Sequence, residues 1–188
     1  MHNKFKIYYF INTFNYDEIN KLDKKVTIIY RNYEFPLNIN IVKKIRDLCK
    51  LNRRKFFISN NLKVAKNLKL DGIYIPSFND SLNFKNLSSH KNFKIIGSAH
   101  NNIELLTKKN QGCEEVFISP LFKSNKKKYF LDKVRFNLIS NFINIKIIAL
   151  GGVNSLNVCK LRSVKCSGFA SISWIKKTGL TKKIRPVL

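Results

Sequence analysis

Short apolar runs alternate with longer amphipathic stretches along the whole chain. The short runs are rich in β-branched and aromatic residues and are continuously apolar, which is typical of parallel strands buried on both faces. They predict eight strands, at residues 7–11, 26–30, 55–59, 72–75, 93–97, 115–119, 145–150 and 169–173.

The longer stretches between these runs predict helices. In one of them Ile41, Ile45 and Leu48 recur at spacings of four and three, which places them on one helix face. The predicted helices are residues 17–21, 41–51, 62–68, 82–87, 103–108, 131–142 and 155–164.

Strand–helix alternation throughout the chain predicts an α/β fold. Eight strands with short connections favour a closed (β/α)8 TIM barrel of parallel strands, because no Gly-x-Gly-x-x-Gly follows the first strand as an open dinucleotide-binding sheet would require. The first helix is short, and only residues 176–188 remain to close the barrel. We therefore expect a trimmed barrel with short first and last helices, in a single domain over residues 1–188.

The composition changes this picture little. The chain of 188 residues carries 36 Lys and Arg against 11 Asp and Glu, a formal net charge of +25. AT-rich coding bias, an anionic substrate and nucleic-acid binding each account for such a charge. The lysines are spread along the chain without a nucleic-acid-binding motif, so we expect no nucleic-acid partner.

Location is predicted from cysteine usage and hydropathy. The four cysteines show no Cys-x-x-Cys spacing, as expected of reduced thiols in a cytoplasmic protein. No apolar run approaches the roughly 20 residues of a membrane span. Nothing in the sequence indicates an oligomeric state.

The residues that follow the predicted strands carry the candidate chemistry, because barrel active sites lie at the carboxyl ends of the strands. Gly151 and Gly152 follow the seventh strand, and Ser173 ends the eighth. Glycines there let backbone N–H groups approach a phosphate. These features predict a phosphorylated small-molecule ligand.

Six segments in order resemble the thiamine phosphate synthase family, which includes the thiazole tautomerases. They are FFISNN (56–61), DGIYI (71–75), IGSAH (96–100), VFISPLF (116–122), IALGGVN (148–154) and GFASIS (168–173). The resemblance spans about residues 26–175. It implies an enzyme of thiamine biosynthesis that joins a hydroxymethylpyrimidine diphosphate to a thiazole phosphate and releases pyrophosphate with the help of Mg²⁺.

The resemblance also implies roles for individual residues. The thiazole phosphate would be held by Gly151, Gly152, Ile172 and Ser173. The catalytic and pyrophosphate-binding positions would be Arg31, Ser98 and Lys127, with further substrate contacts from Asn60, Ser124 and Lys126.

The departures from the family pattern concern magnesium. The two aspartates that bind the ion are replaced by Asn61 and Asn79, so we expect a weak Mg²⁺ site with Asp80 as the one nearby carboxylate. Pro120 stands where the tautomerases have their acid–base histidine. We interpret His100 as a histidine that holds a loop, because no carboxylate is evidently placed to orient it.

Three small-molecule functions remain open. The chain is a weakened thiamine phosphate synthase, a catalytically inactive barrel that binds a phosphorylated small molecule, or a related enzyme acting on another phosphorylated heterocycle.

Overall fold

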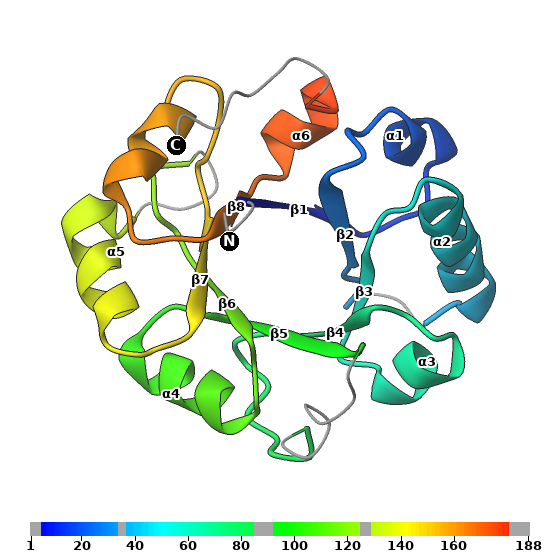
Figure 1. The fold of residues 1–188 in the computed structure, drawn as a ribbon, viewed down its shortest axis with the longest axis horizontal. Helices are drawn as coiled ribbons and strands as arrows, with labels where there is room; N and C mark the ends of the chain where they lie inside the picture. The colour runs from blue at the N-terminus through cyan, green and yellow to red at the C-terminus, as the bar shows by residue number, and fades with distance from the viewer. Residues whose placement is uncertain (1–4, 34–36, 85–91, 125–128, 181–188) are drawn as a thin grey trace.

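A closed barrel of eight parallel strands forms the centre of the protein. The computed structural model describes residues 5–33, 37–84, 92–124 and 129–180. Each strand pairs with its neighbour in sequence, and β8 pairs with β1 to close the barrel (Figure 1). The strands are β1 (Lys6–Ile11), β2 (Val26–Tyr30), β3 (Phe56–Ser59), β4 (Gly72–Ile75), β5 (Lys94–Ala99), β6 (Glu115–Ile118), β7 (Lys146–Leu150) and β8 (Gly168–Ala170).

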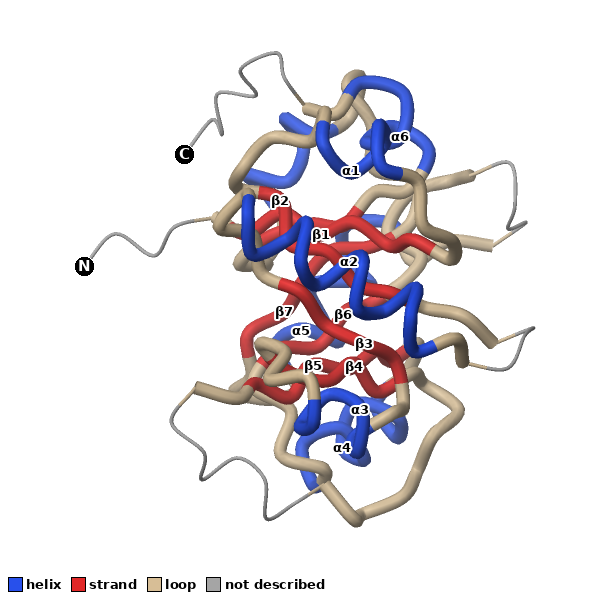
Figure 2. Tube along the Cα trace, turned by 90° about the vertical axis from the view of Figure 1, so that its right-hand side faces the viewer, coloured by secondary structure: helices blue, strands red, loops and turns tan. Residues whose placement is uncertain are grey.

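Helices surround this barrel, as the side view in Figure 2 also shows. They are α1 (Tyr16–Asn20), α2 (Ile39–Leu51), α3 (Leu62–Asn67), α4 (Asn102–Asn110), α5 (Asp132–Asn141), the 3-10 helix η2 (Val158–Ser163) and α6 (Ser173–Thr178). The predicted trimmed (β/α)8 barrel is confirmed, including its short first and last helices. None of the helices in the described ranges is long and apolar enough to cross a membrane.

Asparagine side chains begin four of the helices. The Oδ1 atoms of Asn15, Asn38, Asn61 and Asn101 each accept a backbone N–H from the first turn of the helix that follows. Asparagine is among the best N-cap residues because its side-chain oxygen satisfies an N–H that has no partner within the helix. Asn61, which the resemblance places at a magnesium-binding position, thus uses its side-chain oxygen as a helix cap.

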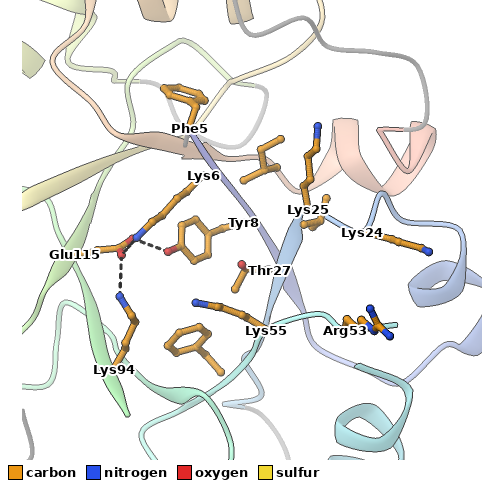
Figure 3. A pocket seen from close by; sticks show the side chains of 13 residues that line it. Phe5, Lys6, Tyr8, Lys24, Lys25, Thr27, Arg53, Lys55, Lys94 and Glu115 are labelled. Carbon is orange, nitrogen blue, oxygen red and sulfur yellow. Dashed lines mark hydrogen bonds and ion pairs between the residues drawn. The ribbon is translucent and has the colours of Figure 1, made fainter. Parts of the chain in front are cut away.

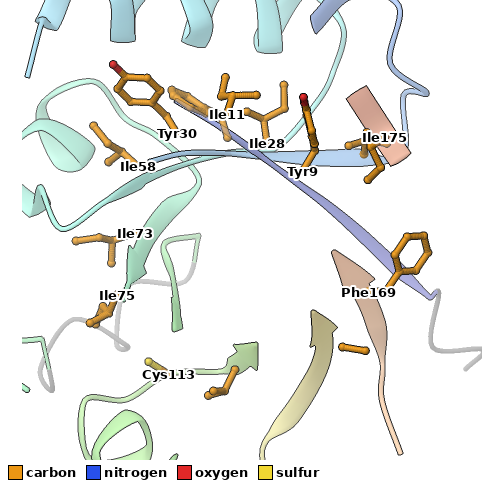
Figure 4. Close-up of a cluster of buried hydrophobic side chains, with 14 of the residues drawn as sticks. Tyr9, Ile11, Ile28, Tyr30, Ile58, Ile73, Ile75, Cys113, Phe169 and Ile175 are labelled. Carbon is orange, nitrogen blue, oxygen red and sulfur yellow. The ribbon is translucent and has the colours of Figure 1, made fainter. Parts of the chain in front are cut away.

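The apolar strand residues divide into two cores. One set points outward and packs under the helices; it includes Tyr9, Ile28 and Ile73 (Figure 4). The other set fills the barrel interior and consists of Tyr8, Phe10, Ile29, Phe57, Tyr74, Ile96, Phe117, Ile148 and Ala170. Both faces of the strands are therefore buried, which explains why the strand sequences are continuously apolar.

Three predicted elements differ from the structure. Leu82 to Phe84 are not helical, and the rest of the predicted helix 82–87 lies outside the described residues. The side chains of Asn79 and Ser81 accept the N–H groups of Ser81 and Asn83, and such local bonds compete with a helix.

The second difference is at residues 155–164, where the helix is of the 3-10 type and limited to Val158–Ser163. Asn154 N–H donates to the Asn157 side chain in the turn before it. The third is β8, which ends at Ala170 rather than at residue 173. The Ser171 hydroxyl turns to donate to the Val153 carbonyl over 2.7 Å, and Ser173 begins α6.

Candidate functional site

A cavity of about 630 Å³ opens at the carboxyl ends of the strands. Residues that follow β2, β4, β6, β7 and β8 line it, together with the end of β5. The aromatic core of the barrel forms its floor, since Tyr74 and Ala170 belong to both. We call this cavity the mouth.

The four residues predicted to hold a phosphate lie together in the mouth: Gly151, Gly152, Ile172 and Ser173. Both glycines have positive φ, 93° and 71°. A Cβ added to Gly151 would lie 2.7 Å from Pro120 Cα, and one added to Gly152 would lie 2.5 Å from Phe122 O. Both positions therefore require glycine, because a side chain would clash with the loop after β6 at a φ that other residues rarely adopt.

Arg31 enters the mouth from the opposite wall. Its backbone N–H donates to the Ile11 carbonyl over 2.8 Å, which continues the pairing of β2 with β1. Its guanidinium carbon lies 5.0 Å from the centre of the Phe10 ring and 5.9 Å from that of Tyr33. These cation–π contacts hold the guanidinium over the barrel core, and its N–H groups suit phosphate oxygens.

Ser98 is held in place from below. The Tyr74 hydroxyl donates to Ser98 Oγ over 2.8 Å, and both residues are buried. Burial raises the pKa of Tyr74 to about 12. The tyrosine is therefore a neutral hydrogen-bond donor near neutral pH, which leaves the Ser98 proton free to be donated to a ligand.

The loop after β6 contributes Lys123 and Ser124 to the mouth. Ser124 was predicted from the sequence, whereas Lys123 was not singled out. The predicted contacts Lys126 and Lys127 lie outside the described residues. Lys123 adds a cation to the lining of the mouth.

Other mouth residues were also missed. Tyr33, Tyr74 and Trp174 line the cavity, and Tyr33 contacts Phe78 with ring centres 5.4 Å apart. Nothing in the sequence distinguishes Tyr74, because aromatic residues are common in strands and Tyr74 lies inside an apolar strand.

The asparagines at the magnesium positions already have partners. Asn61 Oδ1 accepts Val64 N–H over 3.0 Å as the N-cap of α3. Asn79 Nδ2 donates to Asn60 Oδ1 over 2.8 Å, and Asn79 Oδ1 accepts Ser81 N–H. Asn60 is thereby drawn into this amide contact and does not line the mouth.

These side chains do not fit a protein-held Mg²⁺. Asp80 is the one carboxylate of the loop, and it is exposed and outside the lining of the mouth. Among the described residues no three His, Cys, Asp or Glu side chains gather where they could hold a metal. Magnesium sites rely on carboxylates and substrate phosphates, so this chain would leave the ion mainly to the substrate.

A buried lysine supports the same loop. Lys108 Nζ donates to the Asn79 carbonyl over 2.6 Å and to Gln111 Oε1 over 2.9 Å. Gln111 Nε2 donates to the carbonyls of Asn79 and Ser81. Burial lowers the pKa of Lys108. The ammonium thus fixes the backbone of the loop that bears Asn79 and Asp80.

His100 has an orienting carboxylate, and the sequence-based expectation that it lacks one is wrong. Its Nδ1 lies 3.0 Å from Glu104 Oε2, and its backbone N–H donates to the same oxygen. Glu104 is placed by the capping of α4, where Asn101 and Glu104 exchange two hydrogen bonds. His100 lines the mouth, so this pair has the geometry of an oriented acid–base histidine as well as of a loop tie.

Comparisons with known proteins agree on one family for this chain. The family model described as "Thiamine monophosphate synthase" matches residues 20–175. A thiamine-phosphate synthase of Prochlorococcus marinus subsp. pastoris is 30% identical over 133 residues, covering 69% of this chain and 37% of that protein. One of Methanococcus maripaludis is 27% identical over 181 residues, covering 89% and 86%. The chain thus spans well under half of the cyanobacterial relative.

Solved structures agree on the fold. The thiamine phosphate pyrophosphorylase of Pyrococcus furiosus superposes with a TM-score of 0.77 at 19% identity, covering 94% of this chain and 93% of that one. The corresponding protein of Bacteroides thetaiotaomicron gives 0.62 at 20% identity, covering 92% and 85%.

Proposed function

Because the chain belongs to the thiamine monophosphate synthase family, we propose that it joins a hydroxymethylpyrimidine diphosphate to a thiazole phosphate. In this reaction the thiazole nitrogen forms a bond to the pyrimidine methylene carbon, and the bond from that carbon to the diphosphate oxygen breaks. The products are thiamine phosphate and pyrophosphate. One observation carries the proposal. The same cavity holds the glycine wall, formed by Gly151 and Gly152, and Arg31, whose guanidinium is fixed over the Phe10 ring.

The two substrates would bind at different parts of the mouth. The glycine wall, with Gly152 and Ser173, would bind the thiazole phosphate through backbone N–H groups and the serine hydroxyl. Arg31 and Ser98 would bind the diphosphate, whose negative charge grows as the carbon–oxygen bond breaks. Donors that are already oriented, as Ser98 is by Tyr74, stabilise such a charge without reorganising.

Positive charge at the mouth supports departure of the diphosphate. Arg31 and Lys123 line the cavity, while the resemblance adds Lys126 and Lys127 from the residues beyond the described part. Since the described residues do not fit a protein-held Mg²⁺, we derive no step through that ion. We further propose a cytoplasmic location, which the four free cysteines support.

The direct test is turnover by the purified protein. It is incubated with both precursors, with and without Mg²⁺, and thiamine phosphate is measured by chromatography. We expect product formation that Arg31→Ala abolishes and that exposed Lys63→Ala leaves intact. Absence of product at high protein concentration, with both precursors intact, would refute the enzymatic proposal.

One observation favours a second candidate, a barrel that binds a phosphorylated small molecule without turnover. Asn61 and Asn79 stand where the resemblance places two magnesium-binding aspartates, so these carboxylates are missing from the side that would handle the diphosphate. Both asparagine side chains are also engaged in hydrogen bonds within the protein. Calorimetric titration with the thiazole phosphate alone distinguishes the candidates. Tight binding without product in the turnover assay would establish the binding protein.

A further inference from the structure

A second cavity, of about 260 Å³, lies at the opposite end of the barrel, where the strands begin (Figure 3). The starts of β1 and β2, the segment before β3 and the starts of β5 and β6 line it. We call it the floor cavity. Barrel enzymes conduct their chemistry at the other end, so the proposed function leaves this cavity without a role.

The lining of the floor cavity is strongly cationic. Six of its side chains are cations and one is a carboxylate, Glu115; the cations are Lys6, Lys24, Lys25, Arg53, Lys55 and Lys94. Like charges held at one opening repel one another, and a low-dielectric wall strengthens that field. The surplus of positive charge would be relieved by a bound anion.

Glu115 organises two of the lysines. It is 1% exposed, and it accepts hydrogen bonds from Lys6 Nζ and, over 2.5 Å, from the Tyr8 hydroxyl. Lys94 Nζ lies 4.0 Å from Glu115 Oε1 and 3.2 Å from Glu114 Oε2. The carboxylate thus places the ammonium groups of Lys6 and Lys94 on one side of the cavity, as the dashed lines in Figure 3 show.

Lys55 faces them from the other side. Its side chain extends over the floor cavity toward Tyr8 and Glu115 in Figure 3. No ion pair joins its ammonium to any residue in the described part of the chain. Neighbouring Lys24 and Arg53 reach toward the outer rim in the same view. The three inner lysines therefore surround one space, in which Glu114 and Glu115 pair with Lys6 and Lys94 and leave the Lys55 ammonium without an ion-pair partner among the described residues.

We propose that the floor cavity binds a compact inorganic polyphosphate, either diphosphate or triphosphate. Several ammonium groups around one space match several closely spaced negative charges. The volume lies below the usual range for sites of drug-sized ligands, which favours a small anion over a whole nucleotide. This inference concerns a site separate from the mouth and does not rest on the function proposed there.

Calorimetric titration with inorganic triphosphate tests the site. The titration is done in the Arg31→Ala background, so that binding at the mouth is weakened. We expect Lys55→Met to weaken triphosphate binding in this background by at least about tenfold, because it removes the ammonium that lacks a protein partner. Lys63→Met, an exposed lysine on α3, serves as the matched control and should leave the affinity unchanged.

A site-resolved readout accompanies the titration. Pyridoxal phosphate followed by borohydride labels lysines beside phosphate sites, and peptide mapping then locates the label. We expect labelling of Lys55 that triphosphate suppresses. The proposal is overturned if the Arg31→Ala protein binds no triphosphate, if Lys55→Met binds it as tightly as the Lys63→Met control, or if triphosphate leaves Lys55 labelling unchanged.

Discussion

The Tyr74 hydroxyl donates a 2.8 Å hydrogen bond to Ser98 Oγ, and so links the aromatic core of the barrel to the mouth. Tyr74 is fixed by ring contacts with Phe10 and Phe117, whose centres lie 5.2 Å and 5.9 Å away. Because Ser98 Oγ accepts this hydrogen bond from the barrel core, the Ser98 hydroxyl proton remains available to be donated to a ligand in the mouth. The rigidity of the core is thereby passed to one donor of the proposed diphosphate site.

Tyr74→Phe should keep the packing and lose this orientation. We expect diphosphate binding to weaken several-fold and the free energy of unfolding to fall by about 1 kcal/mol, the usual worth of one hydrogen bond. Calorimetric titration and urea unfolding measure the two effects. Tyr16→Phe, at a half-exposed tyrosine outside the mouth, is the matched control. Equal diphosphate affinity in both variants would show that Ser98 needs no support from below.

The same tyrosine should titrate late. Burial raises the pKa of Tyr74 to about 12 from the ordinary value of 10, so the folded state binds its proton more tightly than the unfolded state. The resulting stability is complete below pH 10 and is lost as the pH rises from 10 to about 12. Absorbance near 295 nm should show a phenolate step near pH 12 that Tyr74→Phe removes. A Tyr74 step near pH 10 would contradict its burial.

Gly152→Ala should damage the glycine wall. The new Cβ would lie 2.5 Å from Phe122 O at a φ of 71°, so the loop after β6 must move or the backbone must change. We expect a loss of roughly 1–3 kcal/mol in the free energy of unfolding and loss of thiazole phosphate binding. Thermal unfolding and calorimetric titration measure both.

Gly112→Ala provides the control for that variant, since Gly112 also has a positive φ, of 79°, but does not line the mouth. It should lower stability while preserving ligand affinity. If Gly152→Ala binds the thiazole phosphate as the unmodified protein does, the glycine pair serves packing against the loop after β6 and not the ligand.

Sequence patterns predicted the barrel because each strand is buried on both faces. Such strands are continuously apolar, and this pattern can be recognised from the sequence alone. Boundaries failed where side chains bond locally, as Ser171 does when it ends β8. The glycine wall was predictable because positive φ restricts the residue type. Tyr74 and Lys123 were not, since an aromatic residue in a strand and a lysine in a lysine-rich chain carry no distinguishing mark.

Contacts between side chains were the least predictable part of the site. The sequence places Glu104 four residues after His100, but only the start of α4 at Asn102 turns that spacing into a 3.0 Å contact. The floor cavity was missed for a related reason. Its cations come from separate strand starts, and only closure of the barrel gathers them.

Restoring the two aspartates should restore a magnesium response. Asn61→Asp keeps an N-cap of α3, because aspartate caps as well as asparagine and its charge suits a helix N-terminus. Asn79→Asp removes the donor to Asn60 Oδ1, which frees the loop side chain at a small cost in stability.

In the double variant we expect Mg²⁺ to strengthen diphosphate binding at least about tenfold, against a weak response in the unmodified protein. Titrations with diphosphate at several Mg²⁺ concentrations measure this, with Asn144→Asp, an exposed site before β7, as the charge control. An unchanged Mg²⁺ response in the double variant would mean that the loop around Asn79, held by Lys108, no longer presents its side chains to the diphosphate.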